Sequence, residues 1–149
     1  MVKIRIFKEA DATQVSKLIR KTLLSTNSQD YPQSTLKPLH DYFTPTKVKI
    51  LASERYCLVA EDNGKIVGTG ALEEGELKTI FVEAKLQRQG IGRQLVSALE
   101  KKAQKDGLKS VQVPSSITGA SFYAKLGYKK IRSFMSKNAG QQIWMKKKL

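Results

Sequence analysis

Six residues in the middle of the chain, Gln87-Arg88-Gln89-Gly90-Ile91-Gly92, have the composition of a loop that binds an anion. A strand is predicted before them, over residues 75–82, and an amphipathic helix after them, over residues 93–106. Backbone N–H groups of such a loop and the positive end of such a helix converge on one point, where a phosphate is stabilised. The two glycines would let an anion approach the backbone, and Arg88 and Arg93 would add positive charge.

Two common phosphate-binding motifs do not fit this loop. A dinucleotide fingerprint needs a third glycine three residues after Gly92, where the chain has Leu95. A P-loop needs a Gly-Lys-Ser/Thr sequence, which the chain lacks. The pattern that remains is Gln-x-x-Gly-x-Gly directly after a strand.

In this pattern the chain resembles the GNAT superfamily of acetyl-CoA-dependent N-acetyltransferases, whose acyl-CoA motif is Gln/Arg-x-x-Gly-x-Gly/Ala. A second motif of the superfamily resembles Phe122-Tyr123-Ala124-Lys125-Leu126-Gly127-Tyr128, in the expected order and at roughly the expected distance. The resemblance covers most of the chain and is weakest over residues 25–55.

The resemblance implies a mixed α/β, GNAT-like fold, in which helices flank a mostly antiparallel sheet with one splayed parallel strand pair. Acetyl-CoA would be the cosubstrate, with no metal. Its pantetheine arm would contact the backbone of Ile80 and Val82, and its pyrophosphate would lie against Gln87 to Arg93. The superfamily often has a cofactor-contacting asparagine six residues before the Phe-Tyr pair. This chain has Ser116 there, which offers fewer hydrogen-bond donors.

Acetyl transfer requires a proton for the departing thiolate, and Tyr123 is the candidate donor. A phenol with its unperturbed pKa of about 10 is protonated at neutral pH. In GNAT proteins the tyrosine at this position is often the acid that protonates coenzyme A. On the helix expected here, Ser116, Ala120 and Tyr123 would share one face. The alternative is that Tyr123 only packs beside Phe122 and Tyr128.

The attacking amine must be neutral, although a lysine-like ammonium has a pKa of about 10.4, so a base is expected. Glu76 lies six residues before Val82, a position where some GNAT enzymes have their base. Glu73 and Glu74 in the adjoining turn are rivals. All three are equally compatible with solvent-facing turn residues, and the identity of the base stays open.

Periodicity and turn residues predict the elements that position these groups. Apolar residues at helical spacing predict a helix from Glu9 to about Ser25, with Asp11 and Gln14 forming a capping box. Asp62-Asn63-Gly64 predicts a tight hairpin turn, because Asn-Gly tolerates positive φ. The expected order is strand, helix, helix-rich insertion, three antiparallel strands, helix, strand, helix and final hairpin.

The strand at Ser110–Val113 follows a helix that itself follows the strand Glu76–Val82. A right-handed crossover should therefore place these two strands parallel to one another. Pro114 is expected to end that pairing, and Ser115 or Ser116 is expected to cap a helix that runs through Leu126.

Length and composition favour a single domain over residues 1–149. No stretch approaches the ~18 apolar residues of a membrane span, and the N-terminus lacks a signal peptide, so a cytoplasmic location is expected. Cys57 is the only cysteine, so no internal disulfide can form.

The net charge of +14 is unevenly distributed along the chain. Residues 1–53 sum to +5, residues 54–83 to −4 and residues 84–149 to +13. This is compatible with a basic protein that has a chance cluster of acids. A sharper interpretation assigns the cationic part to a polyanionic cofactor and the acidic strand pair to an amine substrate. Nucleic-acid binding has less support, because the aromatic residues are not interleaved with basic ones on an obvious strand platform.

The acceptor cannot be identified from the sequence. In GNAT proteins the variable region at 25–55 usually shapes the acceptor site, which makes Tyr31, His40, Tyr42 and Phe43 candidates for its lining. A polyamine, an aminoglycoside, an amino acid, and a protein N-terminus or lysine all supply an amine. Dimers are frequent in the superfamily, so a homodimer is compatible with the resemblance.

The leading interpretation is therefore an N-acetyltransferase that acts on an amine acceptor, either a small molecule or a peptide. The alternative is a binding protein, in the form of a GNAT-like module that holds acyl-CoA without turnover or a basic nucleic-acid-binding protein.

Overall fold

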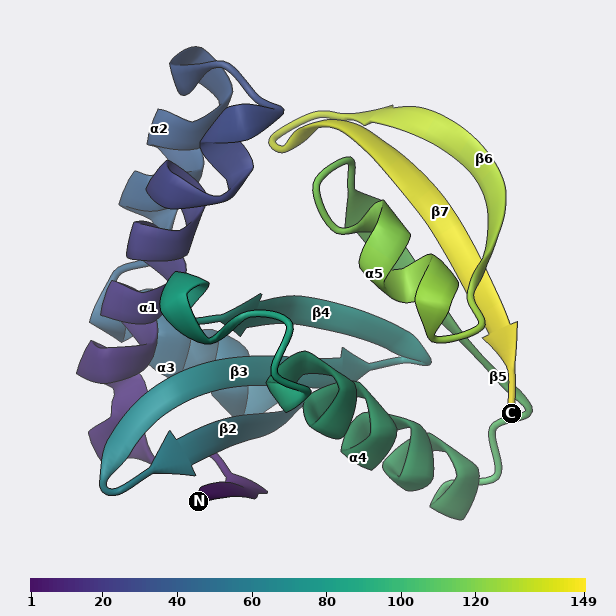
Figure 1. Cartoon of the computed structure of the whole chain (residues 1–149), viewed down its shortest axis with the longest axis horizontal. Coiled ribbons are helices and arrows are strands. Elements are labelled where there is room, and N and C mark those ends of the chain that lie inside the picture. The colour runs from purple at the N-terminus through teal and green to yellow at the C-terminus, as the bar shows by residue number, and fades with distance from the viewer.

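The computed structural model describes all residues from Met1 to Leu149, which form a seven-stranded sheet with helices on both faces (Figure 1). The strand order is β1-β2-β3-β4-β5-β7-β6, and every neighbouring pair is antiparallel except β4 and β5. The strands are β1 (Val2–Ile6), β2 (Tyr56–Asp62), β3 (Lys65–Glu73), β4 (Glu76–Val82), β5 (Ser110–Ser116), β6 (Lys129–Ser136) and β7 (Gly140–Lys148). The α-helices are α1 (Ala12–Ser25), α2 (Gln33–Tyr42), α3 (Pro45–Glu54), α4 (Ile91–Lys105) and α5 (Ala120–Lys125), with short 3₁₀ turns η1 (Glu9–Asp11), η2 (Asn27–Gln29) and η3 (Ala84–Leu86). The mixed α/β fold class expected from the sequence is confirmed.

Strands β2, β3 and β4 form the three-stranded meander that the turn residues predict. Asn63 and Gly64 join β2 to β3 with φ values of 51° and 83°, and Glu74 and Gly75 join β3 to β4 with 49° and 77°. Positive φ at both central positions gives a turn whose twist matches that of the flanking strands. The meander therefore carries the chain directly to the candidate phosphate loop, which follows β4.

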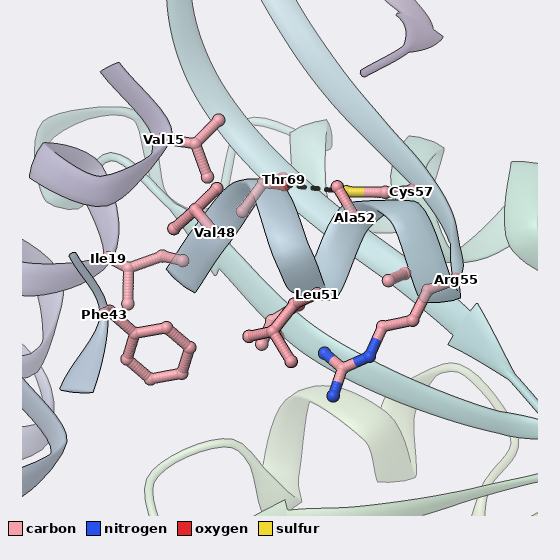
Figure 2. Close-up of a pocket in the computed structure, with 11 residues that line it drawn as sticks. Val15, Ile19, Phe43, Val48, Leu51, Ala52, Arg55, Cys57 and Thr69 are labelled. Atoms are coloured by element: carbon pink, nitrogen blue, oxygen red, sulfur yellow. Dashed lines mark hydrogen bonds between the residues drawn. The ribbon is translucent and has the colours of Figure 1, made fainter. Parts of the chain in front are cut away.

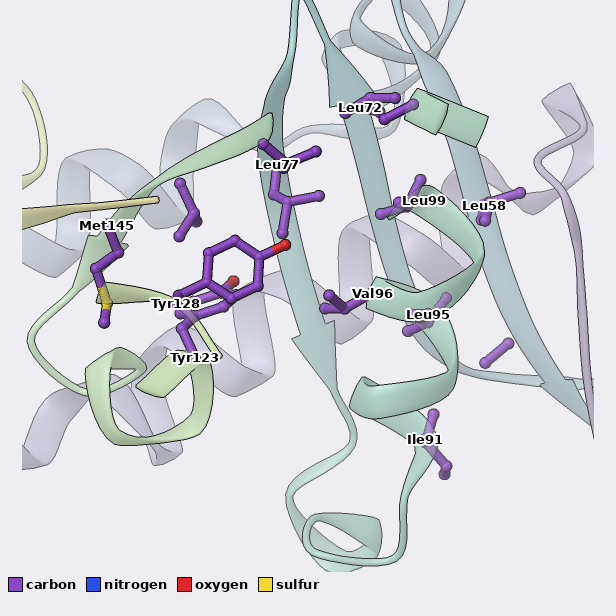
Figure 3. Close-up of a cluster of buried hydrophobic side chains, with 14 of the residues drawn as sticks. Leu58, Leu72, Leu77, Ile91, Leu95, Val96, Leu99, Tyr123, Tyr128 and Met145 are labelled. Atoms are coloured by element: carbon purple, nitrogen blue, oxygen red, sulfur yellow. The ribbon is translucent and has the colours of Figure 1, made fainter. Parts of the chain in front are cut away.

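Two layers of helices cover the two faces of this meander (Figure 1). Helices α1, α2 and α3 pack on one face in a cluster of 11 buried residues that includes Val15, Ile19 and Phe43. Helix α4 packs on the other face through Leu95 and Leu99, which are fully buried in a second cluster of 15 residues (Figure 3). Each cluster uses one face of the sheet, because successive strand residues point to opposite sides.

A bulge bends β4 halfway along its length. Lys78 pairs with Ala71 and Phe81 pairs with Thr69, so two β4 residues, Thr79 and Ile80, lie opposite the single residue Gly70. Thr79 takes a φ of 49°, and a Cβ at Gly70 would lie 2.7 Å from the Ile80 side chain. A bulge twists and bends the strand that carries it. Beyond it β4 leaves β5, and the two strands are paired only at Glu76 and Gln112, which confirms the expected splay.

The structure corrects two expectations about the segment after the crossover. The strand expected at Ser110–Val113 is longer, because β5 continues through Pro114 to Ser116 and pairs with β7 along its whole length. Its pairing with β4 does end before Pro114, since only Gln112 pairs with that strand. The N–H of Gln112 donates to the carbonyl of Gly75 on the β4 side. Since N–H direction alternates along a strand, a residue at 114 would also direct its N–H to that side, where β4 has already departed. The proline therefore costs no ladder bond with β7.

The expected helix from Ser115 or Ser116 is also wrong, because α5 begins only at Ala120. Pairing of Ser115 and Ser116 with Ile143 and Gln142 of β7 overrides the local preference of serine for a helix N-cap.

The expected capping box at α1 is wrong as well. Asp11 does not cap α1 with its side chain; its carboxylate accepts hydrogen bonds from the Lys8 N–H and from both terminal nitrogens of Arg5, at 2.8–2.9 Å. The side chain of Gln14 accepts instead from the N–H of Ile66 on β3. The side chains of Asp11 and Gln14 thus link the start of α1 to the sheet. Such tertiary contacts cannot be inferred from the local spacing of residues.

Asp11→Asn is expected to destabilise the protein at neutral pH and to matter less in acid. The Arg5 guanidinium holds the pKa of the buried Asp11 carboxyl below its usual range. A depressed folded-state pKa gives stability that is present above the unfolded value of about 3.9 and is lost as the pH falls through the folded value. Urea unfolding should show a loss of about 1.5–3 kcal/mol at pH 7 that shrinks below about pH 4. Asp41→Asn, at an exposed ion pair with Lys37, should change little. An equal effect of both variants at pH 7 would contradict this assignment.

Candidate functional site

The loop after β4 presents an unbroken row of free backbone donors. The first amide of this stretch to find an acceptor is that of Gln94, which donates to the Gly90 carbonyl at 3.0 Å. The six N–H groups from Arg88 to Arg93 have no acceptor in the protein. Arg88 and Gly90 take φ values of 67° and 89°, in the left-handed region. Alternation of left- and right-handed residues turns successive N–H groups toward one concavity, which suits an anion.

The glycines and arginines of the loop have different roles. A Cβ at Gly90 would meet no atom within 4 Å, so that side of the loop is open. A Cβ at Gly92 would lie 2.9 Å from the Phe122 ring, so this glycine lets α5 approach α4, in addition to any role toward an anion. The side chains of Arg88 and Arg93 are exposed and free of ion pairs. Exposed, unpaired cations at a helix N-terminus favour an anionic ligand.

Gln87 supports the loop through its side chain. Its amide nitrogen donates to the carbonyl of Val82 at 3.2 Å and to the hydroxyl of Thr26, at the end of α1, at 3.3 Å. These bonds fix the position at which the chain leaves β4. The sequence identified Gln87 by its motif, whereas Thr26 carries no local signal and was missed.

Because β4 and β5 separate after Glu76 and Gln112, one edge of β4 is left unpaired near this loop; the gap between the two strands is called the splay. The N–H of Glu83 donates to Val67 on β3, so by alternation the N–H of Val82 points to the opposite edge, toward the gap between β4 and β5. The Ile80 side chain fills the space over Gly70, and both Ile80 and Val82 pack partly buried against the α4 cluster. The strand edge and the row of free N–H groups are therefore continuous.

Tyr123 of α5 combines burial with an unpaired hydroxyl. Its ring is 6% exposed and lies 5.0 Å from Phe122 and 5.7 Å from Tyr128, centroid to centroid (Figure 3). The hydroxyl makes no hydrogen bond, and it is not a fully enclosed polar atom, since only Thr118 Oγ1 is both enclosed and unpaired. Burial raises the pKa of Tyr123 well above 10, so the phenol keeps its proton across the neutral range.

The proposed common helical face of Ser116, Ala120 and Tyr123 does not exist. Ser116 is the last residue of β5, and its hydroxyl accepts from the N–H of Gly119 at 3.0 Å. This bond closes the turn that leads into α5, while Ser115 donates its hydroxyl to the Ser116 carbonyl. Ser116 nevertheless lies at the end of the strand that borders the splay.

Glu76 is the carboxylate that lies at the point where β4 and β5 part. It pairs with Lys78 at 3.0 Å and its side chain is 32% exposed. Glu73 is bound to Arg55 at 3.1 Å, and Glu74 is an exposed turn residue with positive φ. Of these three acids, only Glu76 belongs to β4.

Comparison with known proteins decides the family. Residues 27–149 match the sequence model of a family described as "Acetyltransferase (GNAT) domain". The chain belongs to the GNAT acetyltransferase family. No curated protein sequence matches it.

Solved structures agree with the GNAT fold. A GCN5-related N-acetyltransferase from Rhodopseudomonas palustris superposes with a TM-score of 0.91 at 22% identity, over 99% of this chain and 95% of that one. The PaiA N-acetyltransferase from Thermoplasma acidophilum, solved in complex with coenzyme A, gives 0.83 at 17% identity over 100% and 99%. An aminoglycoside 6'-acetyltransferase of type Ii gives 0.76 at 23% identity over 98% and 96%. At these identities the likeness establishes the fold.

The acids of this GNAT acetyltransferase do not form an open acidic patch. Five of the seven acids in residues 54–83 are held in ion pairs, in the pairs Arg5–Glu61, Met1–Asp62, Arg55–Glu73, Lys78–Glu76 and Lys21–Glu83. Most charges of this segment are therefore neutralised within the fold, and its role toward an amine substrate stays a prediction.

The four candidates for the acceptor lining separate in the structure. Phe43 lines a small apolar cavity with Val15, Thr79 and Arg55 (Figure 2), whose volume of about 20 Å³ holds roughly one water molecule. Tyr31 instead donates to the Gln141 carbonyl at 2.6 Å and accepts from the Ile117 N–H at 2.8 Å.

His40 and Tyr42 lie outside this cavity. His40 lies beside Asp41 at 3.0 Å, and Tyr42 is exposed beneath Lys47. Only Phe43 therefore faces the bulged part of β4.

A second hollow, a groove separate from the Phe43 cavity, extends the candidate phosphate site. It has a volume of about 270 Å³ and lies between α4, α5 and β7, where it is lined by Arg93, Val96, Ser97, Glu100, Lys125, Leu126 and Lys147. Glu100 in its floor accepts from the hydroxyl of Tyr128 at 2.7 Å and from Lys147 at 3.1 Å. Arg93 belongs to both the loop and the groove. The sequence missed the groove because its members lie up to 54 residues apart.

The remaining structural findings concern membranes and metals. No helix has both the length and the apolar character needed to cross a membrane. No three side chains of His, Cys, Asp or Glu come together as metal ligands.

Proposed function

We propose that this protein transfers the acetyl group of acetyl-CoA to a primary amine by direct attack. The observation that carries the proposal is the row of six unpaired N–H groups from Arg88 to Arg93 at the N-terminus of α4. It is a site for the pyrophosphate of coenzyme A, with Gln89 and Ile91 contributing through their backbone. The groove that begins at Arg93 supplies Ser97 and Lys125 for the nucleotide end of the cofactor.

The open edge of β4 is the proposed site of the pantetheine arm. The Val82 N–H points into the gap between β4 and β5, and Ile80 lies two residues before it on the same strand, in the bulge. An amide-bearing chain can replace the missing β-strand partner there, because unpaired strand edges accept further main-chain hydrogen bonds. Ser116 borders the other side of the splay, where its hydroxyl can still donate one hydrogen bond.

Tyr123 is the proposed general acid. Attack of the amine nitrogen on the thioester carbonyl forms the new C–N bond, and collapse of the tetrahedral species breaks the C–S bond. The departing thiolate then takes the phenolic proton. Tyr123 suits this role because its hydroxyl is unpaired and its raised pKa keeps it protonated.

Glu76 is the proposed base for the acceptor ammonium, directly or through water. It lies on β4 at the mouth of the splay, where Lys78 holds its carboxylate. Glu73 and Glu74 are less well placed, because the first is bound to Arg55 and the second lies in the turn.

The direct test is a panel of amines with acetyl-CoA, with release of the coenzyme A thiol as the readout. Polyamines, aminoglycosides, amino acids and lysine peptides cover the acceptor classes. Turnover of any amine, together with its loss in Glu76→Gln at low pH, supports the proposal. Tight cofactor binding with no turnover across the panel would favour the alternative, a module that holds acyl-CoA without catalysis.

Acetyl-CoA is expected to stabilise the fold. A ligand that binds only the native state adds about 2.7 kcal/mol at 100 times its dissociation constant. For a chain of this length that corresponds to a rise in melting temperature of roughly 5–10 °C. Thermal melts with and without the cofactor measure it, and inorganic sulfate controls for a non-specific anion effect. Coincident melts at saturating acetyl-CoA would contradict the loop assignment.

A further inference from the structure

One face of the C-terminal part of the sheet is covered by a helix only at the tip of β7, where Thr35 of α2 and the neighbouring Tyr31 lie over Gly140. Met145 and Ile143 point to the face that packs on Tyr123 and α4, so Trp144 between them points to the opposite face. The strand register places the following residues on this opposite face, here called the outer face: Ser110, Gln112, Pro114 and Ser116 of β5, Gln142, Trp144, Lys146 and Lys148 of β7, and Lys129, Arg132, Phe134 and Ser136 of β6.

The two large aromatic side chains of this outer face are not used by the core. Neither Trp144 nor Phe134 belongs to, or packs against, either cluster of buried side chains. Helix α5 lies on the inner side of the β6–β7 arch, and β6 is the last strand of the sheet (Figure 1). The structure thus leaves a half-buried tryptophan and a half-buried phenylalanine on this face, packed against each other rather than into the core.

These rings stack on one another beside a guanidinium group, so each turns only one face away from the pair. Trp144 and Phe134 are stacked at 5.3 Å with an angle of 20° between their planes. Arg132 lies 5.7 Å from the centre of the Phe134 ring. Their neighbours in the register are Lys146 and Lys129, which pair across the two strands. Aromatic rings and cations therefore lie next to one another across the two strands, an arrangement that only the strand register reveals.

The charge that β5, β6 and β7 carry has one sign, and the nearest acid on this side, Glu76 of β4, is paired with Lys78. Residues 107–149 contain nine Lys or Arg and no Asp or Glu. Of the nine, only Lys147 forms an ion pair, with Glu100 on the inner side. The four cations of the outer face, Lys129, Arg132, Lys146 and Lys148, are all exposed. A ligand for this surface should therefore be a polyanion that also carries flat, stackable groups.

We propose that the outer face binds single-stranded nucleic acid. Bases stack on exposed aromatic planes regardless of sequence, while neighbouring Lys and Arg contact the phosphates. A second copy of this chain fits the surface poorly, because a two-fold interface would place its four cations against the same four cations. A polyanion without bases would use the charge and leave the rings unused.

The single tryptophan of the chain allows a direct test, because Trp144 lies on the outer face. Tryptophan emission should be quenched saturably as a short oligouridylate is added. The cofactor site is first saturated with coenzyme A, so that the oligonucleotide cannot bind there. If the four cations contact phosphates, log K against log salt should have a slope of about −3. Inorganic polyphosphate should leave the emission unchanged.

Matched variants localise the binding. Lys146→Gln should reduce the salt slope by about 0.7, whereas Lys101→Gln on the exposed side of α4 should not. Phe134→Leu should weaken oligouridylate binding about 5- to 150-fold. Gly90→Val, which alters the cofactor loop alone, should leave oligouridylate binding intact, so failure of the cofactor site and failure of this proposal are distinguishable.

Three results would overturn the proposal. The first is unchanged tryptophan emission in wild-type protein at saturating oligouridylate. The second is equal affinity for polyphosphate and oligouridylate. The third is an emission change that depends on protein concentration alone, which would identify the outer face as a contact between two copies.

Discussion

Replacing Gly90 by valine is expected to abolish binding of acetyl-CoA at concentrations that saturate the wild type. Gly90 has a φ of 89° and no atom within 4 Å of the position of a Cβ. A β-branched residue is strained at this φ, and its side chain would occupy the open side of the loop. Relaxation of the loop would misdirect at least two of the six N–H groups. At about 1.5–3 kcal/mol for each charge-assisted hydrogen bond, affinity should fall about 10²- to 10⁴-fold.

Titration calorimetry measures this loss, and Gly64→Val is the matched control. Gly64 also has positive φ, at 83°, and open space around its Cβ position, but it lies in the β2–β3 turn. Both variants should lose similar stability, roughly 1–3 kcal/mol, while only Gly90→Val loses the cofactor. Unchanged affinity in Gly90→Val would show that the loop is not the phosphate site.

Tyr123→Phe is expected to lower kcat and kcat/KM together by about 10²- to 10⁴-fold, or about 3–5 kcal/mol of barrier. Phenylalanine keeps the ring contacts with Phe122 and Tyr128, and the hydroxyl that is lost has no hydrogen-bond partner. Stability should therefore change little. The KM for acetyl-CoA should stay near its original value, because the lost interaction acts only in the transition state. Steady-state kinetics with an amine from the panel provides the measurement.

Tyr128→Phe is the matched control, because it should show the opposite pattern. The Tyr128 hydroxyl donates to Glu100 at 2.7 Å, so its removal leaves a partly buried carboxylate with Lys147 as its remaining partner. We expect a loss of stability of about 1–3 kcal/mol with kcat nearly unchanged. Full activity in Tyr123→Phe would mean that water protonates the thiolate and the ring only packs.

The pH dependence gives a further check on the same residue. Burial raises the pKa of Tyr123 above its ordinary value of 10, so its protonated form persists throughout the neutral and mildly basic range. The kcat profile should therefore show no decline that depends on Tyr123 below about pH 10. A basic limb near pH 8 that disappears in Tyr123→Phe would contradict this environment for the phenol.

Features that depend on neighbours in the chain were predictable from the sequence. Asn63-Gly64 predicted a hairpin turn because those residues tolerate positive φ, and the structure has positive φ at both. Gly90 followed by the amphipathic pattern of α4 predicted the candidate phosphate loop, since its backbone donors come from consecutive residues. The parallel β4–β5 pair followed from the handedness of a strand-helix-strand crossover. These conclusions needed no knowledge of distant contacts.

Features that depend on pairing between distant segments were not predictable in this way. Ser115 and Ser116 have the local chemistry of a helix cap, but seven successive register pairs with β7 extend the strand through them. Glu61 and Asp11 look like free acids until Arg5, 56 and 6 residues away, binds both. Charge counted along the chain therefore does not reveal which acids are neutralised in the fold.

The sequence by itself determined the family, the mixed α/β class and the position of the candidate anion-binding loop, because each rests on local backbone conformation and residue spacing. The tertiary structure decided which of the neighbouring Tyr123 and Tyr128 hydroxyls is unpaired. The Tyr128 hydroxyl donates to Glu100, whereas the Tyr123 hydroxyl has no partner. The tertiary structure also decided that Trp144 and Phe134 meet on the outer face rather than in the core. Burial and partnership are properties of packed surfaces, and these surfaces exist only once strands and helices remote in the chain are brought together.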